Sequence, residues 1–124
     1  MNLTPNFTLK EFACKDGTPV PHEYLPNVTE LAKNLQVLRD TLGVPVIITG
    51  SGYRTSAHNR KVKGATNSQH LYAKAADINA IGYTPAQLAA VIEKLITAGK
   101  MKQGGIGIYR NFVHYDIRGT KARW

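Results

Sequence analysis

The sequence is poor in the features that mark secreted, membrane-spanning and repeat proteins. Its 124 residues include one cysteine, Cys14, which excludes an internal disulfide and fits folding in a reducing compartment. No stretch approaches the ~20 apolar residues of a membrane span. Residues 1–12 lack the basic-then-apolar pattern of a secretory signal, and no internal repeat is visible. We therefore expect one domain, residues 1–124, that is made in the cytoplasm and buries a core without disulfides.

Acidic residues are scarce as well. The chain has 8 of them against 16 lysines and arginines, which gives a formal net charge of +8 and an attraction to polyanions. The basic residues are spread over three regions, near 54–63, 100–102 and 118–123, and no arginine-rich arm or nucleic-acid module accompanies them. We interpret them as solvated surface charge and expect no specific nucleic acid as partner. Salt-sensitive binding to DNA or RNA remains an alternative, and anionic cell-wall polymer is another.

Apolar spacing and turn residues predict an α+β domain. Two main helices are expected at 27–42 and 85–98, where apolar residues recur every three or four positions. Gly43 and Gly99 are expected to end them, and Thr84 with Gln87 forms a capping box at the start of the second. Shorter segments predict a helix at 56–62, strands at 44–49, 75–80, 106–109 and 112–117, and an extended loop at 18–26.

The strand at 112–117 divides its side chains between two faces. Val113, Tyr115 and Ile117 form an apolar face that is typical of a core, while His114 and Asp116 belong to the other face. In the strand at 75–80, alternation places Asp77 on one face with small residues beside it. If these two strands are neighbours, His114 and Asp116 lie next to Asp77.

Histidines number only four, so each can be considered separately. His70 and Asp77 lie seven residues apart, and His114 follows far downstream. Two imidazoles and one carboxylate are the ligand set of a catalytic zinc, which keeps a fourth position open for water. This spacing is less diagnostic than a helical His-Glu-x-x-His, so surface or hydrogen-bonded histidines remain an alternative. His22 is expected in a loop, and His58 is expected to be hydrogen-bonded near the site.

The pattern Ser68-x-His70-x-x-Ala73-x-Ala75-x-Asp77, followed by His114, resembles the signature of the zinc D-Ala-D-Ala carboxypeptidases. Their wider group includes lysostaphin-type and sonic-hedgehog-type metal sites. The segment 51–55 resembles the arginine-bearing segment of the same family. The similarity runs over residues 6–124 and is greatest to small single-domain forms from phage and prophage genomes. One departure is Ala73, where the family usually has glycine; if the backbone there needs a positive φ angle, alanine is strained.

The resemblance implies a fold and a function. The fold would be hedgehog/D,D-peptidase-like, with two main helices on a small, mostly antiparallel sheet and Zn²⁺ held by His70, Asp77 and His114. The activity would be hydrolysis of peptidoglycan stem peptides, by D,D-carboxypeptidase or endopeptidase action, in a phage or prophage endolysin. Such an enzyme would act on the bacterial cell wall after its release from the cytoplasm.

Roles for further residues follow from the same resemblance. Arg54 matches the arginine that steadies substrate or oxyanion, with a plain surface arginine as the alternative. Ser68, Tyr53 and Tyr72 are expected to contact substrate.

The catalytic base is less well defined. In the family, a carboxylate a few residues upstream of the last zinc histidine usually serves as base, but residues 110–113 offer none. We assign this role to Asp116 as a hypothesis, with the alternative that it orients an imidazole. The missing upstream carboxylate also supports a rival interpretation of the whole chain, a non-catalytic zinc-binding module that recognises cell-wall peptide.

Overall fold

A five-stranded sheet organises the protein, whose computed structural model describes all 124 residues. The strand order is β3-β4-β6-β5-β7, and every neighbouring pair is antiparallel except β5 with β7. The strands are β3 (Val46–Ile48), β4 (Ala75–Ala80), β5 (Gly105–Ile108), β6 (Val113–Asp116) and β7 (Ala122–Arg123). The prediction of an α+β domain with a mostly antiparallel sheet is confirmed.

The first main helix, α1 (Leu25–Leu42), begins two residues earlier than predicted. A short 3₁₀ turn, η2 (His22–Tyr24), precedes it, so the extended loop predicted at 18–26 is wrong over its second half. Pro26 is accommodated because it lies in the first helical turn, where its missing N–H has no partner to lose. The helix ends at Gly43, which has a φ of 69° and is left-handed as expected.

The other helices follow their sequence signals closely. In α3 (Pro85–Thr97), the Gln87 backbone N–H donates to Thr84 Oγ1 at 3.1 Å. The Thr84 backbone N–H donates to Gln87 Oε1 at 2.9 Å, which completes the predicted capping box. A shorter helix, α2 (Ser56–Lys61), occupies the predicted position. No helix combines the length and the apolar composition that crossing a bilayer would need.

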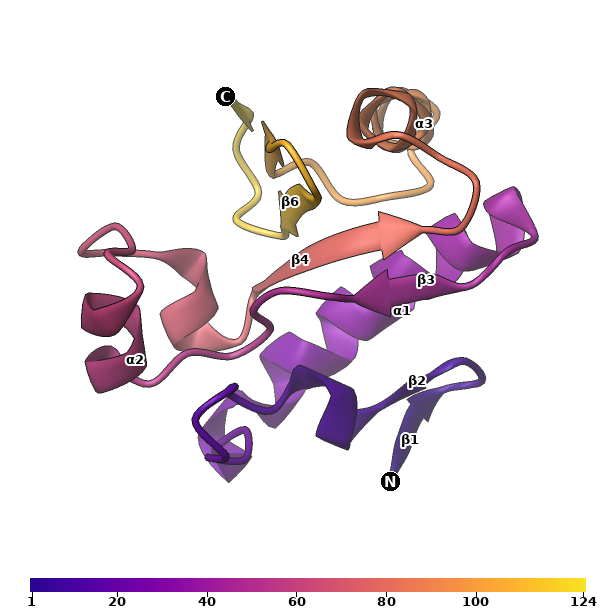
Figure 1. Cartoon of the computed structure of the whole chain (residues 1–124). Helices are drawn as coiled ribbons and strands as arrows, with labels where there is room; N and C mark the ends of the chain where they lie inside the picture. Colours follow the sequence, from indigo (N-terminus) through magenta and orange to yellow (C-terminus); the bar gives the residue numbers. More distant parts are fainter.

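Three short elements were not predicted. The strands β1 (Asn2–Thr4) and β2 (Phe7–Thr8) form a separate antiparallel hairpin, and β7 has only two residues. Strands this short leave no periodic signal in a sequence. Figure 1 shows the hairpin beside α1, where Gln36 of the helix accepts hydrogen bonds from Thr4 Oγ1 and the Asn6 N–H, both at 2.9 Å. A 3₁₀ turn, η1 (Leu9–Phe12), follows the hairpin.

The two main helices and one face of the sheet enclose the core. Both α1 and α3 contact the sheet and each other (Figure 1). Val113, Tyr115 and Ile117 are all buried in this core, which confirms the division of faces predicted for the last long strand. The opposite face of β4 and β6 carries Asp77 and His114, so alternation along two neighbouring strands separates the core from the candidate site.

Ala73 is the one buried residue with a backbone conformation that suits glycine. It follows η3 (Gln69–Tyr72), has a φ of 58° and is 1% exposed. Its N–H donates to the His70 carbonyl at 3.3 Å, so the left-handed turn lets the chain pass directly from His70 into β4. A glycine here would adopt this conformation without strain, whereas alanine adopts it under strain.

Ala73→Gly is therefore expected to raise the free energy of unfolding by about 0.5–1 kcal/mol, since relief of the left-handed strain outweighs the lost methyl group. The matched control is Ala76→Gly in β4, which is equally buried but has ordinary strand geometry. That variant should lose about 1 kcal/mol. Urea unfolding of both variants measures the difference. An equal loss of stability in the two proteins would contradict the strain argument.

Candidate metal centre

The sheet register brings two of the predicted ligands face to face. In the antiparallel pair β4–β6, Asp77 is the direct partner of His114. His70 reaches the same point from η3, whose first turn is fixed by Ser68 Oγ accepting the His70 N–H at 3.2 Å. One potential ligand atom from each of the three residues lies within 4.8 Å of the others, and all three side chains are buried. The structure thus gathers the predicted His70, Asp77 and His114 into one group.

Each imidazole is oriented by a hydrogen bond at its far nitrogen. His70 Nδ1 lies 2.7 Å from the Gly52 carbonyl oxygen, which can only accept, so Nδ1 carries the proton. Its Nε2 then faces Asp77 Oδ1 at 3.3 Å. His114 is turned the other way: its Nε2 lies 2.6 Å from Asp116 Oδ2, and its Nδ1 lies 3.5 Å from Asp77 Oδ1. Both rings therefore direct their second nitrogen at the same carboxylate oxygen.

Asp77 is buried beneath the two rings. Its Oδ2 accepts from the Ser51 N–H at 3.3 Å and lies 3.6 Å from Arg54 Nη2. Burial by itself raises the pKa of Asp77, but hydrogen bonds from His114 and His70 outweigh it and hold the pKa well below its usual range. The carboxylate is consequently charged, with Oδ1 directed to the imidazoles.

Asp116 is completely buried and saturated with donors. Its Oδ1 accepts from the Gly105 N–H at 2.9 Å and from the Arg118 N–H and Nε at 3.1 and 2.9 Å. Its Oδ2 accepts from His114 Nε2 and from Arg118 Nη2 at 2.7 Å. Burial raises the pKa of Asp116, but the bonds from His114 and Arg118 dominate and lower it far below normal. A side chain at Gly105 would collide with this carboxylate, so glycine there permits the close approach.

These contacts bear on the two roles considered for Asp116. A base needs an oxygen that can reach a water in the cavity, whereas both Asp116 oxygens are hydrogen-bonded and Asp116 does not line the cavity. The contacts favour the second role, in which Asp116 orients His114 and supports its basicity. In agreement, burial lowers the pKa of His114 but hydrogen bonds to Asp116 and Asp77 outweigh it, and the net pKa is raised.

The donor set fits zinc. It offers His70 Nε2, Asp77 Oδ1 and His114 Nδ1, with the far nitrogen of each imidazole fixed by a backbone carbonyl or a carboxylate. Nitrogen and oxygen ligands from three residues, with one side open to a cavity, are the arrangement found in catalytic rather than structural zinc sites.

A cavity of about 570 Å³ opens over the three ligands. Its charged lining is mostly basic, with Arg54, Lys63 and Arg118 facing one acidic residue, Asp77. Aromatic rings form another part of the wall: Trp124 lies 4.9 Å from the His114 ring, between ring centroids, and donates from Nε1 to the Tyr109 hydroxyl at 2.7 Å. The cavity therefore combines a metal-binding floor with cationic and aromatic walls.

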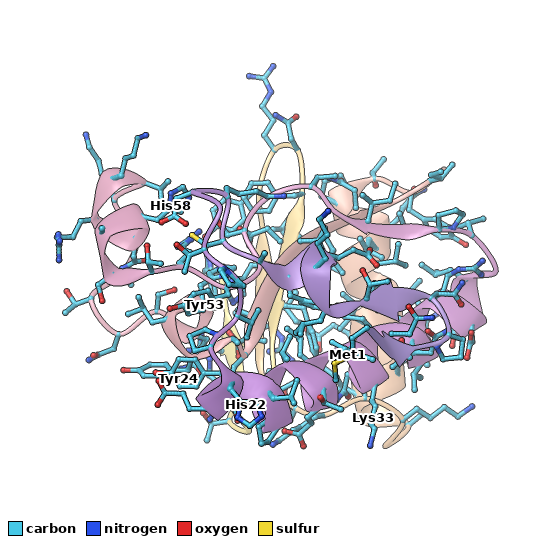
Figure 2. The ribbon with its side chains drawn as sticks, turned by 90° about the horizontal axis from the view of Figure 1, so that it is seen from below. Met1, His22, Tyr24, Lys33, Tyr53 and His58 are labelled. Carbon is cyan, nitrogen blue, oxygen red and sulfur yellow. The ribbon has the colours of Figure 1, made fainter.

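Only some of the other predicted site residues lie in the cavity. Ser68 and Arg54 line the cavity, but Tyr53 and Tyr72 do not. Both tyrosines instead pack around Tyr24, each with a ring-centroid separation of 6.2 Å. His58 is also absent from the cavity and lies beside Cys14 and Asp16 on α2, at the end of the molecule that Tyr24 and Tyr53 occupy in Figure 2. The expectation that His58 lies near the predicted zinc ligands is wrong.

Arg118 was missed as a member of the site. It binds Asp116 through two guanidinium nitrogens, lies 5.5 Å from the Trp124 ring and lines the cavity. The sequence feature that could have identified Arg118 is its spacing of two residues from Asp116, because strand alternation places Arg118 and Asp116 on the same face as His114.

A sequence model of a peptidase family, described as Peptidase M15, matches residues 4–116. The chain belongs to the peptidase M15 family. This is the zinc D-Ala-D-Ala carboxypeptidase-like family that the sequence motifs resemble, and its members are zinc enzymes. Membership makes the protein a metallopeptidase in class and agrees with the buried His70, Asp77 and His114 group. No curated protein matches the chain significantly.

Zinc affinity of this M15 protein should increase with pH and then level off. Zinc needs the unprotonated Nδ1 of His114, and the raised pKa of His114 extends the range in which a proton competes for the site. Below that pKa, each proton displaced makes affinity rise about tenfold per pH unit. Competition with a chromophoric chelator between about pH 5.5 and about pH 8.5 measures the dependence. A constant affinity over this range would contradict the assignment of His114.

Proposed function

We propose that the protein is a zinc-dependent peptidase that hydrolyses peptidoglycan stem peptides. The observation that carries the proposal is the convergence of His70, Asp77 and His114 at the floor of an open, basic cavity in a chain of the M15 family. We further propose that residues 1–124 act as one zinc peptidase domain with a hedgehog/D,D-peptidase-like fold.

The chain's own residues divide the catalytic work. When bound, a zinc ion would lower the pKa of a water in its open position toward ~7 and polarise the scissile carbonyl. Asp116 holds His114 in the orientation that presents Nδ1, and Gly52 does the same for Nε2 of His70. The protein thereby fixes the ligand geometry before substrate binds, which reduces the reorganisation needed during reaction.

Arg54 is proposed to combine a structural and an electrostatic role. Its Nε donates to Ser51 Oγ at 2.9 Å, its Nη1 donates to Asn59 Oδ1 at 3.1 Å, and its Nη2 faces Asp77. These contacts fix the guanidinium at the cavity wall, where its charge stabilises negative charge that develops on the substrate oxygen. Because the group is already ordered, it loses little conformational entropy when substrate arrives.

The cavity walls support a substrate with a carboxylate. Lys63 and Arg118 line the cavity beside Arg54, and Ser68 offers a hydroxyl at the same wall. Stem peptides carry free carboxylates, and the cationic side chains suit them through charge-assisted hydrogen bonds. We propose D,D-carboxypeptidase or endopeptidase action. Because the sequence motifs resemble those of small phage forms, we also propose a phage or prophage lytic enzyme that reaches the cell wall after release from the cytoplasm.

A second candidate function is a non-catalytic zinc-binding module that recognises cell-wall peptide. The observation favouring it is that Asp77 is the only carboxylate in the cavity lining and is also a ligand candidate. With Asp116 saturated by hydrogen bonds, no carboxylate in the cavity is free to accept a proton from water.

Digestion of purified peptidoglycan by the zinc-loaded protein separates these functions. Release of D-alanine indicates carboxypeptidase action, and new amino groups with loss of cross-linked fragments indicate endopeptidase action. Mass spectrometry of the soluble products distinguishes the two, with chelator-stripped protein as the control. If fully zinc-loaded protein binds peptidoglycan without releasing either product, the peptidase proposal fails and the recognition module is supported.

A further inference from the structure

A second group of potential metal ligands lies outside the cavity. Cys14, Asp16 and His58 each offer one donor atom, and these three atoms lie within 4.8 Å of one another. Cys14 and Asp16 belong to the turn after η1, whereas His58 belongs to the first turn of α2. None of the three lines the cavity over His70, Asp77 and His114. This second group therefore brings a thiol, a carboxylate and an imidazole together from two distant segments.

Hydrogen bonds within the protein fix the positions of the turn donors. The Cys14 N–H donates to the Thr18 carbonyl at 2.8 Å, and the Gly17 N–H donates to the Cys14 carbonyl at 2.9 Å. The Thr18 N–H donates to Asp16 Oδ1 at 2.9 Å. Gly17 has a φ of 97°, which closes this tight turn. The spacing of the thiol and the carboxylate is thus set by backbone geometry.

The turn is also joined to the helix that carries His58. Thr55 Oγ1 donates to Asp16 Oδ2 at 2.9 Å and accepts from the His58 N–H at 3.1 Å, as the N-cap of α2. His58 makes this bond through its backbone, which leaves the imidazole nitrogens available. The Cys14 side chain is buried beside it, with the residue 3% exposed. Asp16 is exposed, and bonds from Thr18, Thr55 and Cys14 hold its pKa far below the usual range, so it is charged at neutral pH.

We propose that Cys14, Asp16 and His58 bind a thiophilic divalent cation of the zinc class. A thiolate, a carboxylate and a neutral imidazole are all zinc ligands, and the two negative charges balance a divalent ion. The thiolate selects against magnesium and calcium, which prefer oxygen ligands. Three protein ligands leave one position, which the exposed Asp16 side of the turn opens to water.

The new site would stabilise residues 52–54, a segment that also contacts His70. The Tyr53 N–H donates to the Phe12 carbonyl at 2.8 Å, which joins this segment to η1 just before Cys14. On the same segment, the Gly52 carbonyl orients the His70 ring, and the Arg54 N–H donates to the His70 carbonyl at 2.9 Å. A cation bound by Cys14, Asp16 and His58 would link the turn after η1 to the first turn of α2, and so restrain the residues that lie between them and His70.

Cobalt substitution tests the proposal because the chain has a single cysteine. Metal-free wild-type protein is titrated with Co²⁺ and its absorption is recorded. A ligand set of two histidines and one aspartate gives weak visible bands, whereas a bound thiolate adds an intense near-ultraviolet charge-transfer band. We expect wild type to bind one Co²⁺ equivalent in addition to the one at His70, Asp77 and His114, and to show the sulfur band. The band should remain in His114→Ala and disappear in Cys14→Ser.

Two further variants establish whether the whole group binds. His58→Gln should weaken the affinity that produces the sulfur band by at least about tenfold, as expected for loss of a ligand. His22→Gln, which removes an exposed histidine of η2, should leave this affinity unchanged. Circular dichroism confirms that each variant is folded. Absence of the sulfur band in folded wild type overturns the proposal, as does an unchanged affinity in His58→Gln. Because the sulfur band does not depend on activity, this failure is distinct from failure of the proposed peptidase function.

Discussion

His114→Ala is expected to abolish zinc binding at the active site together with peptide hydrolysis. The substitution removes one of three protein ligands and leaves Asp116, which is buried and charged, without the imidazole that it binds. We expect kcat/KM on peptidoglycan fragments to fall by at least about 10³-fold, equivalent to about 4 kcal/mol of transition-state stabilisation. Elemental analysis of the purified protein, in which the variant should hold one zinc equivalent fewer than wild type, and a product assay measure the two effects.

His22→Ala is the matched control for that experiment. His22 is exposed in η2 and belongs neither to the cavity nor to either group of potential ligands. It should keep both active-site zinc and turnover. If the His114 variant retained wild-type activity, the assignment of the ligand set would be wrong. If it lost activity while its active-site zinc remained, His114 would serve catalysis without holding the metal.

Asp116→Asn should weaken zinc binding more than it slows the reaction at saturating zinc. The amide can still contact His114, but it loses the negative charge and places an NH₂ group against donors from Gly105, Arg118 or His114. An orienting role predicts a loss of zinc affinity of about 10–100-fold with partial recovery of turnover when zinc is added. A base role predicts normal zinc affinity and turnover reduced by about 10²–10⁴-fold.

The same variant should lower the free energy of unfolding of the metal-free protein by about 2–3 kcal/mol. This is less than for a fully buried ion pair, because Arg118 is partly exposed. Glu93→Gln is the control: Glu93 binds Arg123 through two oxygens at 2.6 and 2.8 Å, but it is on α3, outside the cavity. It should cost about 1 kcal/mol or less and leave zinc affinity unchanged. Equal losses of zinc affinity in both variants would exclude a specific role for Asp116.

The free energy of unfolding of the metal-free protein should decrease in acid. Asp77 and Asp116 both have pKa values that lie below their unfolded values in the folded state. As pH falls below about 4, the unfolded chain takes up these protons first and stability decreases. The stabilisation from the two carboxylates is therefore fully present above this range and is lost below it.

The sequence by itself determined the elements with strong local signals and the identity of the ligand candidates. The capping box at Thr84 and the left-handed Gly43 are fixed by interactions between residues a few positions apart. Strand alternation separated Tyr115 from His114 because successive side chains point to opposite faces. The ligand residues could be named because imidazole and carboxylate groups are few in this chain.

Only the tertiary structure decided what surrounds those residues. The contact of Asp116 with Gly105 depends on how β5 lies against β6, and no local pattern encodes that register. The same reason explains why His58, expected near the zinc ligands, lies instead against Cys14. Packing between distant segments sets these neighbours, since their contacts arise from the burial of shared apolar surface rather than from the residues next to them in sequence.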